Sequence, residues 1–62
     1  MIQVTLRGNT YGIRYTLKEL GFRWYYDHNC WVKNFKDSEE DKANEIATRW
    51  NYEGVYGRIE KF

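Results

Sequence analysis

Apolar and polar residues alternate over residues 2–7, and this spacing predicts a half-buried β-strand at the start of the chain. Over residues 13–20, isoleucine and leucine instead recur at the spacing of one helical face, which predicts a short helix. Asn9 or Thr10 is expected to cap this helix, because their side-chain oxygens accept a free amide proton. Gly21 is expected to end it, because glycine adopts the left-handed conformation without steric cost.

The C-terminal part of the chain predicts a longer helix followed by a strand. The helix spans about 38–51, with Ser38 as its N-cap and a group of carboxylates in its first turn, where the helix dipole favours negative charge. Its buried face is expected to consist of Ala43, Ile46, Ala47 and Trp50. Residues 51–54 predict a loop, and alternation over 55–60 predicts the last strand.

Between the two helices, residues 21–35 (GFRWYYDHNCWVKNF) are rich in aromatic side chains and predict two strands joined by a turn at 27–29. The pairing register decides which side chains face the core, because a slip of one residue turns every side chain to the opposite face. With this three-residue loop, Trp31 faces outward; with a four-residue loop at 27–30, it faces the core. The first register is preferred, since the second places Lys33 in the core.

The predicted order is strand, helix, strand, strand, helix, strand, in a single α+β domain that spans residues 1–62. It matches the ferredoxin-like split βαβ plan (βαββαβ), in which one antiparallel four-stranded sheet has two helices on one face. A more open α+β sandwich of the same elements is the alternative. In the ferredoxin-like plan the other sheet face is uncovered, and Tyr11 and Tyr15 are expected to pack at its rim.

Length and composition fit one small domain of the cytoplasm. A chain of 62 residues buries only about 60% of its unfolded surface, so the aromatic content of 19% is needed to fill a core. One cysteine cannot form an intrachain disulfide. With no signal peptide and no apolar run of membrane length, the chain is expected in the reducing cytoplasm, without a membrane partner. The start at Met1 indicates a complete small protein.

The net charge of +1 conceals an uneven distribution of charges along the chain. Residues 1–35 carry five cations and two anions, a net charge of +3, whereas residues 36–62 carry five cations and seven anions, a net charge of −2. The basic half is also the aromatic half. Cations bind phosphates and rings stack on bases, so this combination indicates a nucleic-acid surface. The plainer interpretation is that the acidic half forms one solvated helix.

In the preferred register, the uncovered sheet face combines aromatic rings with cations. The residues expected to bind single-stranded or distorted DNA are Arg7, Arg23, Tyr25, Trp31, Lys33 and Arg58. An exposed Trp31 with Arg23 and Lys33 beside it would stack on unpaired bases. The same surface also fits a protein-binding hot spot, in which Trp, Tyr and Arg dominate. If these rings are all needed in the core, neither surface exists.

A second hypothesis is a protein-binding module, for example a phage-encoded inhibitor of a host enzyme, that uses its acidic helix as a mimic of DNA. The contact residues would then be Glu39, Glu40, Asp41 and Glu45. The chain is expected to be a monomer or a weak homodimer, the latter with the uncovered sheet faces of two copies packed together.

No set of residues in the sequence points to catalysis. His28 and Cys30 have no second His or Cys to complete a metal site, and no third group orients them as a nucleophile and base. Cys30 is therefore expected to be a small packed side chain. Helix capping explains the clustered carboxylates, and no Gly-rich phosphate loop is present. We expect a protein that is not an enzyme and holds no metal or cofactor.

The run LKELGFRWYYDHNCWVKNF resembles a small module of phage and bacterial proteins, in which a short helix is followed by Gly-x-Arg-Trp, a polar turn and a Trp-led strand. It is more distantly similar to the HARP domain of annealing helicases, in which an Arg/Tyr-Asp turn leads to a Trp-containing strand and an acidic helix start. The matching residues, over roughly half the chain, are Leu17, Leu20, Gly21, Arg23, Trp24, Asp27, Trp31 and Asp37.

This resemblance implies DNA transactions, particularly at junctions between single and double strands. The chain departs from the phage-type pattern at Tyr25-Tyr26, where an Asp commonly follows the Trp. It also has no attached motor or nuclease domain, so the resemblance carries over binding alone.

Overall fold

The computed structural model describes residues 1–49 and 54–62, and within them four strands form one antiparallel sheet. The strands are β1 (Ile2–Gly8), β2 (Arg23–Tyr25), β3 (Cys30–Phe35) and β4 (Val55–Lys61), in the order β2-β3-β1-β4. The 3₁₀ turn η1 (Tyr11–Ile13) leads into helix α1 (Arg14–Glu19), and η2 (Asp37–Glu39) leads into helix α2 (Glu40–Arg49). This topology confirms the predicted ferredoxin-like βαββαβ fold.

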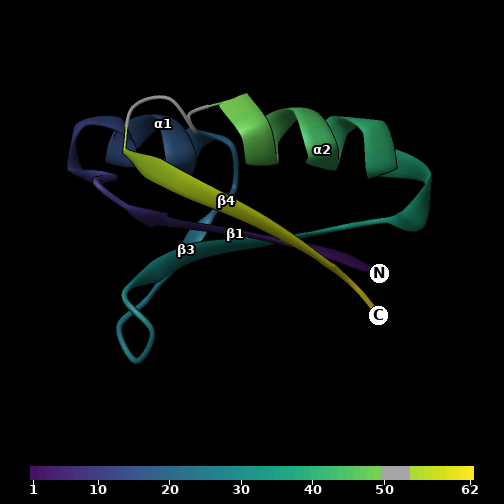
Figure 1. Ribbon diagram of the computed structural model, residues 1–62, viewed down its shortest axis with the longest axis horizontal. Coiled ribbons are helices and arrows are strands. Elements are labelled where there is room, and N and C mark those ends of the chain that lie inside the picture. The colour runs from purple at the N-terminus through teal and green to yellow at the C-terminus, as the bar shows by residue number, and fades with distance from the viewer. Residues whose placement is uncertain (50–53) are drawn as a thin grey trace.

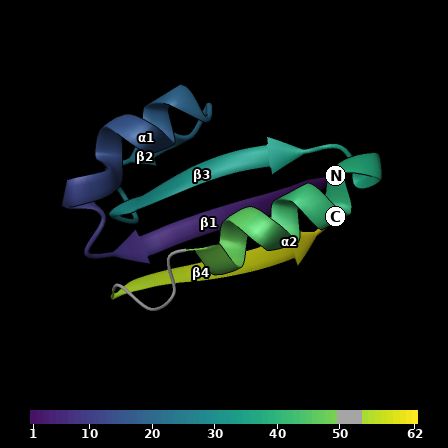
Figure 2. The ribbon, with the colours of Figure 1, turned by 90° about the horizontal axis from the view of Figure 1, so that it is seen from above.

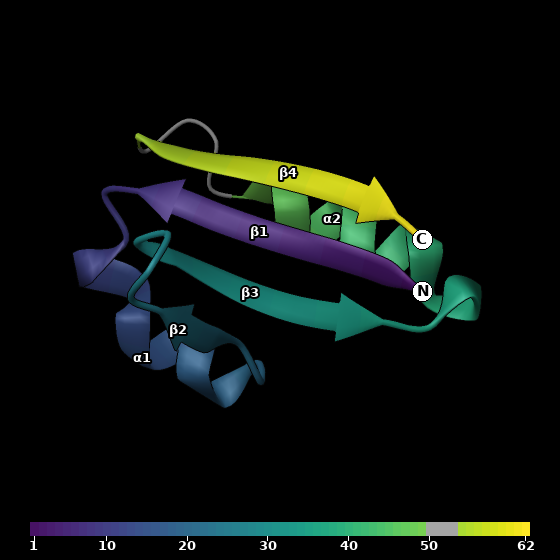
Figure 3. The same cartoon turned by 90° about the horizontal axis from the view of Figure 1, so that it is seen from below.

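Both helices lie on the same side of the sheet (Figure 1). Helix α2 packs on β1 and β4, and α1 lies over β2 (Figure 2). From the opposite side, the four strands lie in front of both helices (Figure 3). The two chain ends meet at one end of the sheet, where the Phe62 amide donates a hydrogen bond of 2.8 Å to the Met1 carbonyl. The fold therefore has one covered sheet face and one uncovered face.

On the covered face, β1 contributes every second residue to the core, as its alternating sequence predicts. Ile2, Val4 and Leu6 are at most 1% exposed and face the helices. The sheet register places Phe35 of β3 opposite Ile2, and Trp31 of β3 opposite Leu6. Because large apolar side chains of the two central strands meet in these pairs, they form the centre of the core.

Helix α1 ends where the sequence predicts. Gly21 has φ +96°, and its amide donates to the Lys18 carbonyl at 3.1 Å. The Phe22 amide donates to the Leu17 carbonyl at 2.9 Å. These two bonds are those of a Schellman motif, which satisfies the last carbonyls of a helix and brings an apolar pair together. Here that pair is Leu17 and Phe22, both buried in the core.

The helix starts differ from the predicted ones. Thr10 precedes η1, but its side chain makes no capping bond, because its hydroxyl accepts a hydrogen bond from the Trp31 indole. At the second helix, the first turn starts after Lys36 instead of Ser38, so the predicted cap is wrong. The Lys36 amide donates a hydrogen bond of 3.1 Å to the Glu39 carboxylate, and the Glu39 amide donates one of 2.9 Å to the Lys36 carbonyl. These two bonds between the same residues fix the start of the helix at Lys36.

Helix α2 approaches β4 closely at Gly57. A methyl group at Gly57 would lie 1.7 Å from the Ala47 carbonyl oxygen, so no larger residue fits without moving the helix. The buried residues of the helix are Ala43, Ile46 and Ala47, as predicted. The expected contact of Trp50 and most of the expected loop at 51–54 lie outside the described residues.

The β2–β3 hairpin adopts a register that the sequence did not suggest. Tyr25 lies opposite Cys30, across a four-residue loop at 26–29. Both registers considered above placed residue 26 in the strand, so both pairings are wrong, although the second correctly predicted a four-residue loop and Trp31 on the core face. Asn29 ends the loop with φ +50°, a left-handed conformation that asparagine tolerates better than most residues. As a result, Trp31 faces the helices and Tyr25 faces away from them.

Candidate nucleic-acid interface

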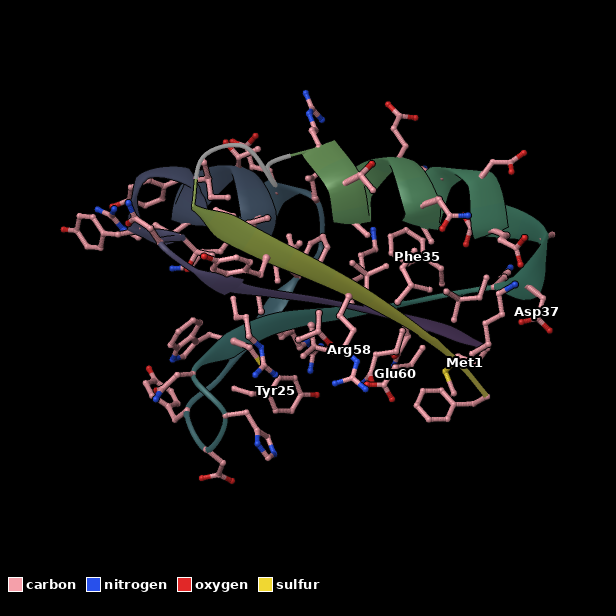
Figure 4. The ribbon with its side chains drawn as sticks, viewed as in Figure 1. Met1, Tyr25, Phe35, Asp37, Arg58 and Glu60 are labelled. Carbon is pink, nitrogen blue, oxygen red and sulfur yellow. The ribbon has the colours of Figure 1, made fainter. Side chains whose placement is uncertain are left out.

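The register aligns the side chains of the uncovered face in rows across the sheet. One row consists of Arg23, Val32, Thr5 and Arg58, in strand order from β2 to β4. The next row holds Tyr25 and Cys30 on β2 and β3, and Arg7 and Tyr56 on β1 and β4. With strands about 4.8 Å apart, the backbones of Arg23 and Arg58 are about 14 Å apart across the face. Figure 4 shows Tyr25, Arg58 and Glu60 on this side of the sheet and Phe35 on the side of α2.

Two tyrosine rings stand at the two edges of this face. Tyr25 is 48% exposed and Tyr56 is 67% exposed. Between them, the central strands β1 and β3 contribute Thr5 and Cys30, which are buried, and Arg7, which is exposed. Cys30 is a packed side chain, as expected, although it is packed on the uncovered face.

A shallow depression of about 380 Å³ lies beside the hairpin. It is lined by Gln3, Thr5, Arg7, Tyr25, His28, Cys30, Val32 and Glu60. His28 lines it from the hairpin loop, and the other lining residues come from the four strands of the sheet. The lining includes the Arg7 guanidinium, the Glu60 carboxylate, the Tyr25 ring and the His28 imidazole, beside smaller side chains.

The charges of the uncovered face are predominantly positive. Three arginines, Arg7, Arg23 and Arg58, share it with one carboxylate, Glu60, which gives a net charge of +2. Arg58 Nε lies 3.3 Å from Glu60 Oε1, with both side chains well exposed, and such surface pairs contribute little to stability. Within residues 1–49 and 54–62, Arg7 and Arg23 form no ion pair, so their guanidinium groups can bind an anion.

Trp31 does not belong to this face, which corrects the sequence prediction. It is 6% exposed and lies among the core residues beneath the helices. Its ring packs edge-on against Trp24, with the centroids 5.4 Å apart, and its Nε1 donates a hydrogen bond of 3.1 Å to Thr10 Oγ1. The Trp31 ring and Phe35 point to the same side of β3, and burying two large rings outweighs the cost of placing Lys33 there.

Lys33 also lies on the covered side, for a reason the sequence analysis did not consider. Its side chain is half-buried, and its ammonium donates a hydrogen bond to the Leu20 carbonyl at the end of α1. The ammonium lies 4.8 Å from the Phe35 ring centroid. A lysine can thus bury its apolar stem while its charge reaches the edge of the structure, next to a helix C-terminus that favours cations.

Tyr11 and Tyr15 do not pack at the rim of the sheet, contrary to expectation. They are 73% and 65% exposed. The Arg14 guanidinium carbon lies 3.8 Å from the Tyr11 ring centroid and 4.6 Å from that of Tyr15. The sequence signal for part of this cluster is Tyr11 three positions before Arg14, a spacing that brings two side chains together on a helix.

The acidic helix proposed as an alternative interface has part of its charge engaged within the protein. Glu40 forms an ion pair with Lys61, and Glu39 accepts the Lys36 amide. Asp41 and Glu45 are exposed. Because two of its four carboxylates already have partners, this helix offers a weaker anionic surface than its sequence indicates. Its role as a contact surface for a host protein stays a prediction.

Metal-ligating side chains do not gather in the described part of the chain, where no three of His, Cys, Asp and Glu lie close enough to hold an ion. Nor does any helix among residues 1–49 and 54–62 have the length and apolar character needed to cross a membrane. The uncovered face offers guanidinium groups, phenol rings and one carboxylate, with the His28 imidazole beside it at the hairpin loop.

Comparison with other proteins does not assign this chain to a family. We found no family model, no curated protein and no solved structure that matches this chain. The resemblance to the phage and bacterial Gly-x-Arg-Trp module and to the HARP domain therefore stays a prediction, and function has to be inferred from the geometry of the chain itself.

Proposed function

We propose that this protein is a small nucleic-acid-binding module that binds unpaired strands across the uncovered face of its sheet. The observation that carries the proposal is the grouping of four of the six predicted contact residues on that face. These four are Arg7, Arg23, Tyr25 and Arg58, and Tyr56 joins them. Helices cover the other face, so a strand of nucleic acid has one extended surface to approach.

The residues of this face have complementary roles in the proposal. Guanidinium groups bind phosphate oxygens with two parallel hydrogen bonds, and three of them span the width of the sheet. The Tyr25 and Tyr56 rings are exposed enough to stack on bases. Trp31 and Lys33, which the sequence placed here, take no part, so the interface relies on tyrosine for stacking.

An unpaired strand is a better ligand for this face than a duplex. Rings stack on bases only where the bases are free of their neighbours, and a duplex offers none along its side. The two exposed rings stand on opposite edge strands, so a single strand crossing the sheet can meet both of them. The resemblance noted above points to DNA, at junctions of single and double strands, and to a phage or bacterial setting.

A salt titration with a fluorescent single strand of about 12 nucleotides tests the proposal, since sites of this kind cover roughly 4–16 nucleotides. Three phosphate contacts give a slope of log K against log salt of about −2 for a single strand. Between 50 and 200 mM salt the affinity should therefore fall by about twentyfold. The duplex of the same sequence should bind more weakly than the single strand at each salt concentration.

Matched substitutions separate the uncovered face from the covered one. Arg23→Met should weaken binding and lower the magnitude of the salt slope by about 0.7. Lys33→Met removes the same charge from the other side of the sheet and should leave the slope unchanged. Tyr25→Ala should weaken binding at least about fivefold, whereas Tyr25→Phe, which keeps the ring, should not. Binding that is absent at low salt, or equally affected by the Arg23 and Lys33 substitutions, would refute the proposal.

A further inference from the structure

A groove of about 340 Å³ lies on the other side of the hairpin from the uncovered sheet face. Its walls include Asn9, Thr10, Tyr11, Arg14, Trp24 and Trp31. This volume falls at the small end of the range for ligand pockets. Among residues 1–49 and 54–62, none that lines the groove carries a carboxylate, and the one formal charge they contribute is the guanidinium of Arg14.

The floor of the groove is aromatic, with Trp24 and Trp31 in its lining. Trp31 is buried, and its indole N–H is already bonded to Thr10 Oγ1 at 3.1 Å. Trp24 is half-buried, which leaves part of its ring accessible in the groove. A flat aromatic ligand would therefore meet indole carbon atoms here. Beside them, the Asn9 side-chain amide and the Thr10 hydroxyl proton can bond to the edge of such a ligand.

Arg14 is held in place at the groove. Its Nη1 donates a hydrogen bond of 2.6 Å to the Tyr11 carbonyl, and its guanidinium lies over the Tyr11 and Tyr15 rings. The bond to the carbonyl uses one of five N–H donors, and no carboxylate among residues 1–49 and 54–62 forms an ion pair with it. A guanidinium fixed in this way loses little freedom when it binds a phosphate.

We propose that this groove binds a single nucleotide, with its base against Trp24 and its phosphate on Arg14. The combination of an aromatic floor, polar groups for a base edge and one unpaired guanidinium suits a planar base that carries an anion. The inference rests on the proposed nucleic-acid function, and it adds a second contact point for one base of a bound strand. An apolar side chain of a protein partner would use the floor and leave Arg14 without an anion.

Titration with adenosine monophosphate, followed by NMR of the tryptophan indole N–H signals, tests the groove by itself. The chain has three tryptophans, and Trp24→Phe identifies the Trp24 signal. The nucleotide should shift that signal with a dissociation constant in the millimolar range. Arg14→Gln should raise this constant about tenfold, as expected for loss of a charged hydrogen bond. Adenosine, which lacks the phosphate, should bind with the same affinity to both proteins.

Two outcomes would overturn the groove assignment. One is a Trp24 signal that the nucleotide leaves unchanged; the other is an affinity that Arg14→Gln leaves unchanged. The Tyr25→Ala protein is the matched control, because it alters the uncovered face and should still bind adenosine monophosphate normally. Failure of the groove leaves the salt-dependent binding of the 12-nucleotide strand intact, whereas failure of the proposed function abolishes that binding in the unsubstituted protein.

Discussion

Replacing Gly57 with alanine should strongly destabilise the fold, because the backbone of α2 occupies the space that the new methyl group needs. The added carbon would lie 1.7 Å from the Ala47 carbonyl oxygen and 2.7 Å from its carbonyl carbon. Restoring an ordinary contact of 3.4 Å requires α2 and β4 to separate by about 1.7 Å. Overpacking of this kind costs about 3 kcal/mol, and here the contact is with backbone, which cannot rotate away.

A loss of about 3 kcal/mol is large for this chain, since a domain of its length has a free energy of unfolding of roughly 3–9 kcal/mol. The melting temperature should fall by at least about 12 °C. Thermal and urea unfolding followed by circular dichroism measure both quantities. Gly12→Ala is the matched control: apart from its chain neighbours and its own helical turn, no atom of residues 1–49 and 54–62 lies within 4 Å of the added carbon. This variant should unfold as the parent does or be slightly more stable. Equal stability of the two variants would refute the packing of α2 on β4.

Three further predictions concern polar contacts. Thr10→Val should lower the free energy of unfolding by about 1–3 kcal/mol, because it leaves the buried Trp31 indole N–H without an acceptor; Thr10→Ser should not, and urea unfolding measures the difference. The N-terminal ammonium beside Asp37 holds the pKa of that carboxyl below its ordinary value of 3.8. This contact stabilises the fold above about pH 4 and is lost as the pH falls through the lower folded-state pKa, so the difference in melting temperature between the parent and Asp37→Asn should vanish in acid. Lys33→Met should cost about 1 kcal/mol in the same unfolding assay, since a carbonyl in the last turn of α1 loses its donor.

Much of the fold follows from local patterns in the sequence. The alternation of β1 and the helical spacing of the two apolar faces each fix an element and its buried side without reference to the rest of the chain. Gly21 ends α1 through a motif that is itself local. Once six elements are known in this order, few topologies bury both helices on one sheet, so the ferredoxin-like plan could be predicted.

The hairpin register could not be predicted, because the residues of β3 are ambiguous. One side of that strand carries Cys30 and Val32, and the other carries Trp31, Lys33 and Phe35. A rule that keeps lysine out of the core selects the wrong side. The structure resolves the conflict through a contact between elements that are distant in sequence, the bond from the Lys33 ammonium to the end of α1.

The wrong hairpin register also explains which part of the candidate site could be predicted. Residues on β1, β2 and β4 fall on the expected face, because their alternation is clear. The two contacts assigned to β3, Trp31 and Lys33, fall on the opposite face. The groove beside Arg14 was missed because it joins the β1–α1 connection to the hairpin, and only the tertiary fold brings these segments together.

Mapping amide shifts by NMR during titration with the unlabelled 12-nucleotide single strand tests the central claim most directly. The account predicts that the largest shifts fall on the backbone amides of Arg7, Arg23, Tyr25 and Arg58, and that they shrink as salt is added. The amides of α2 should stay in place. Shifts concentrated on α2, or no shifts on the uncovered face at low salt, would contradict the account.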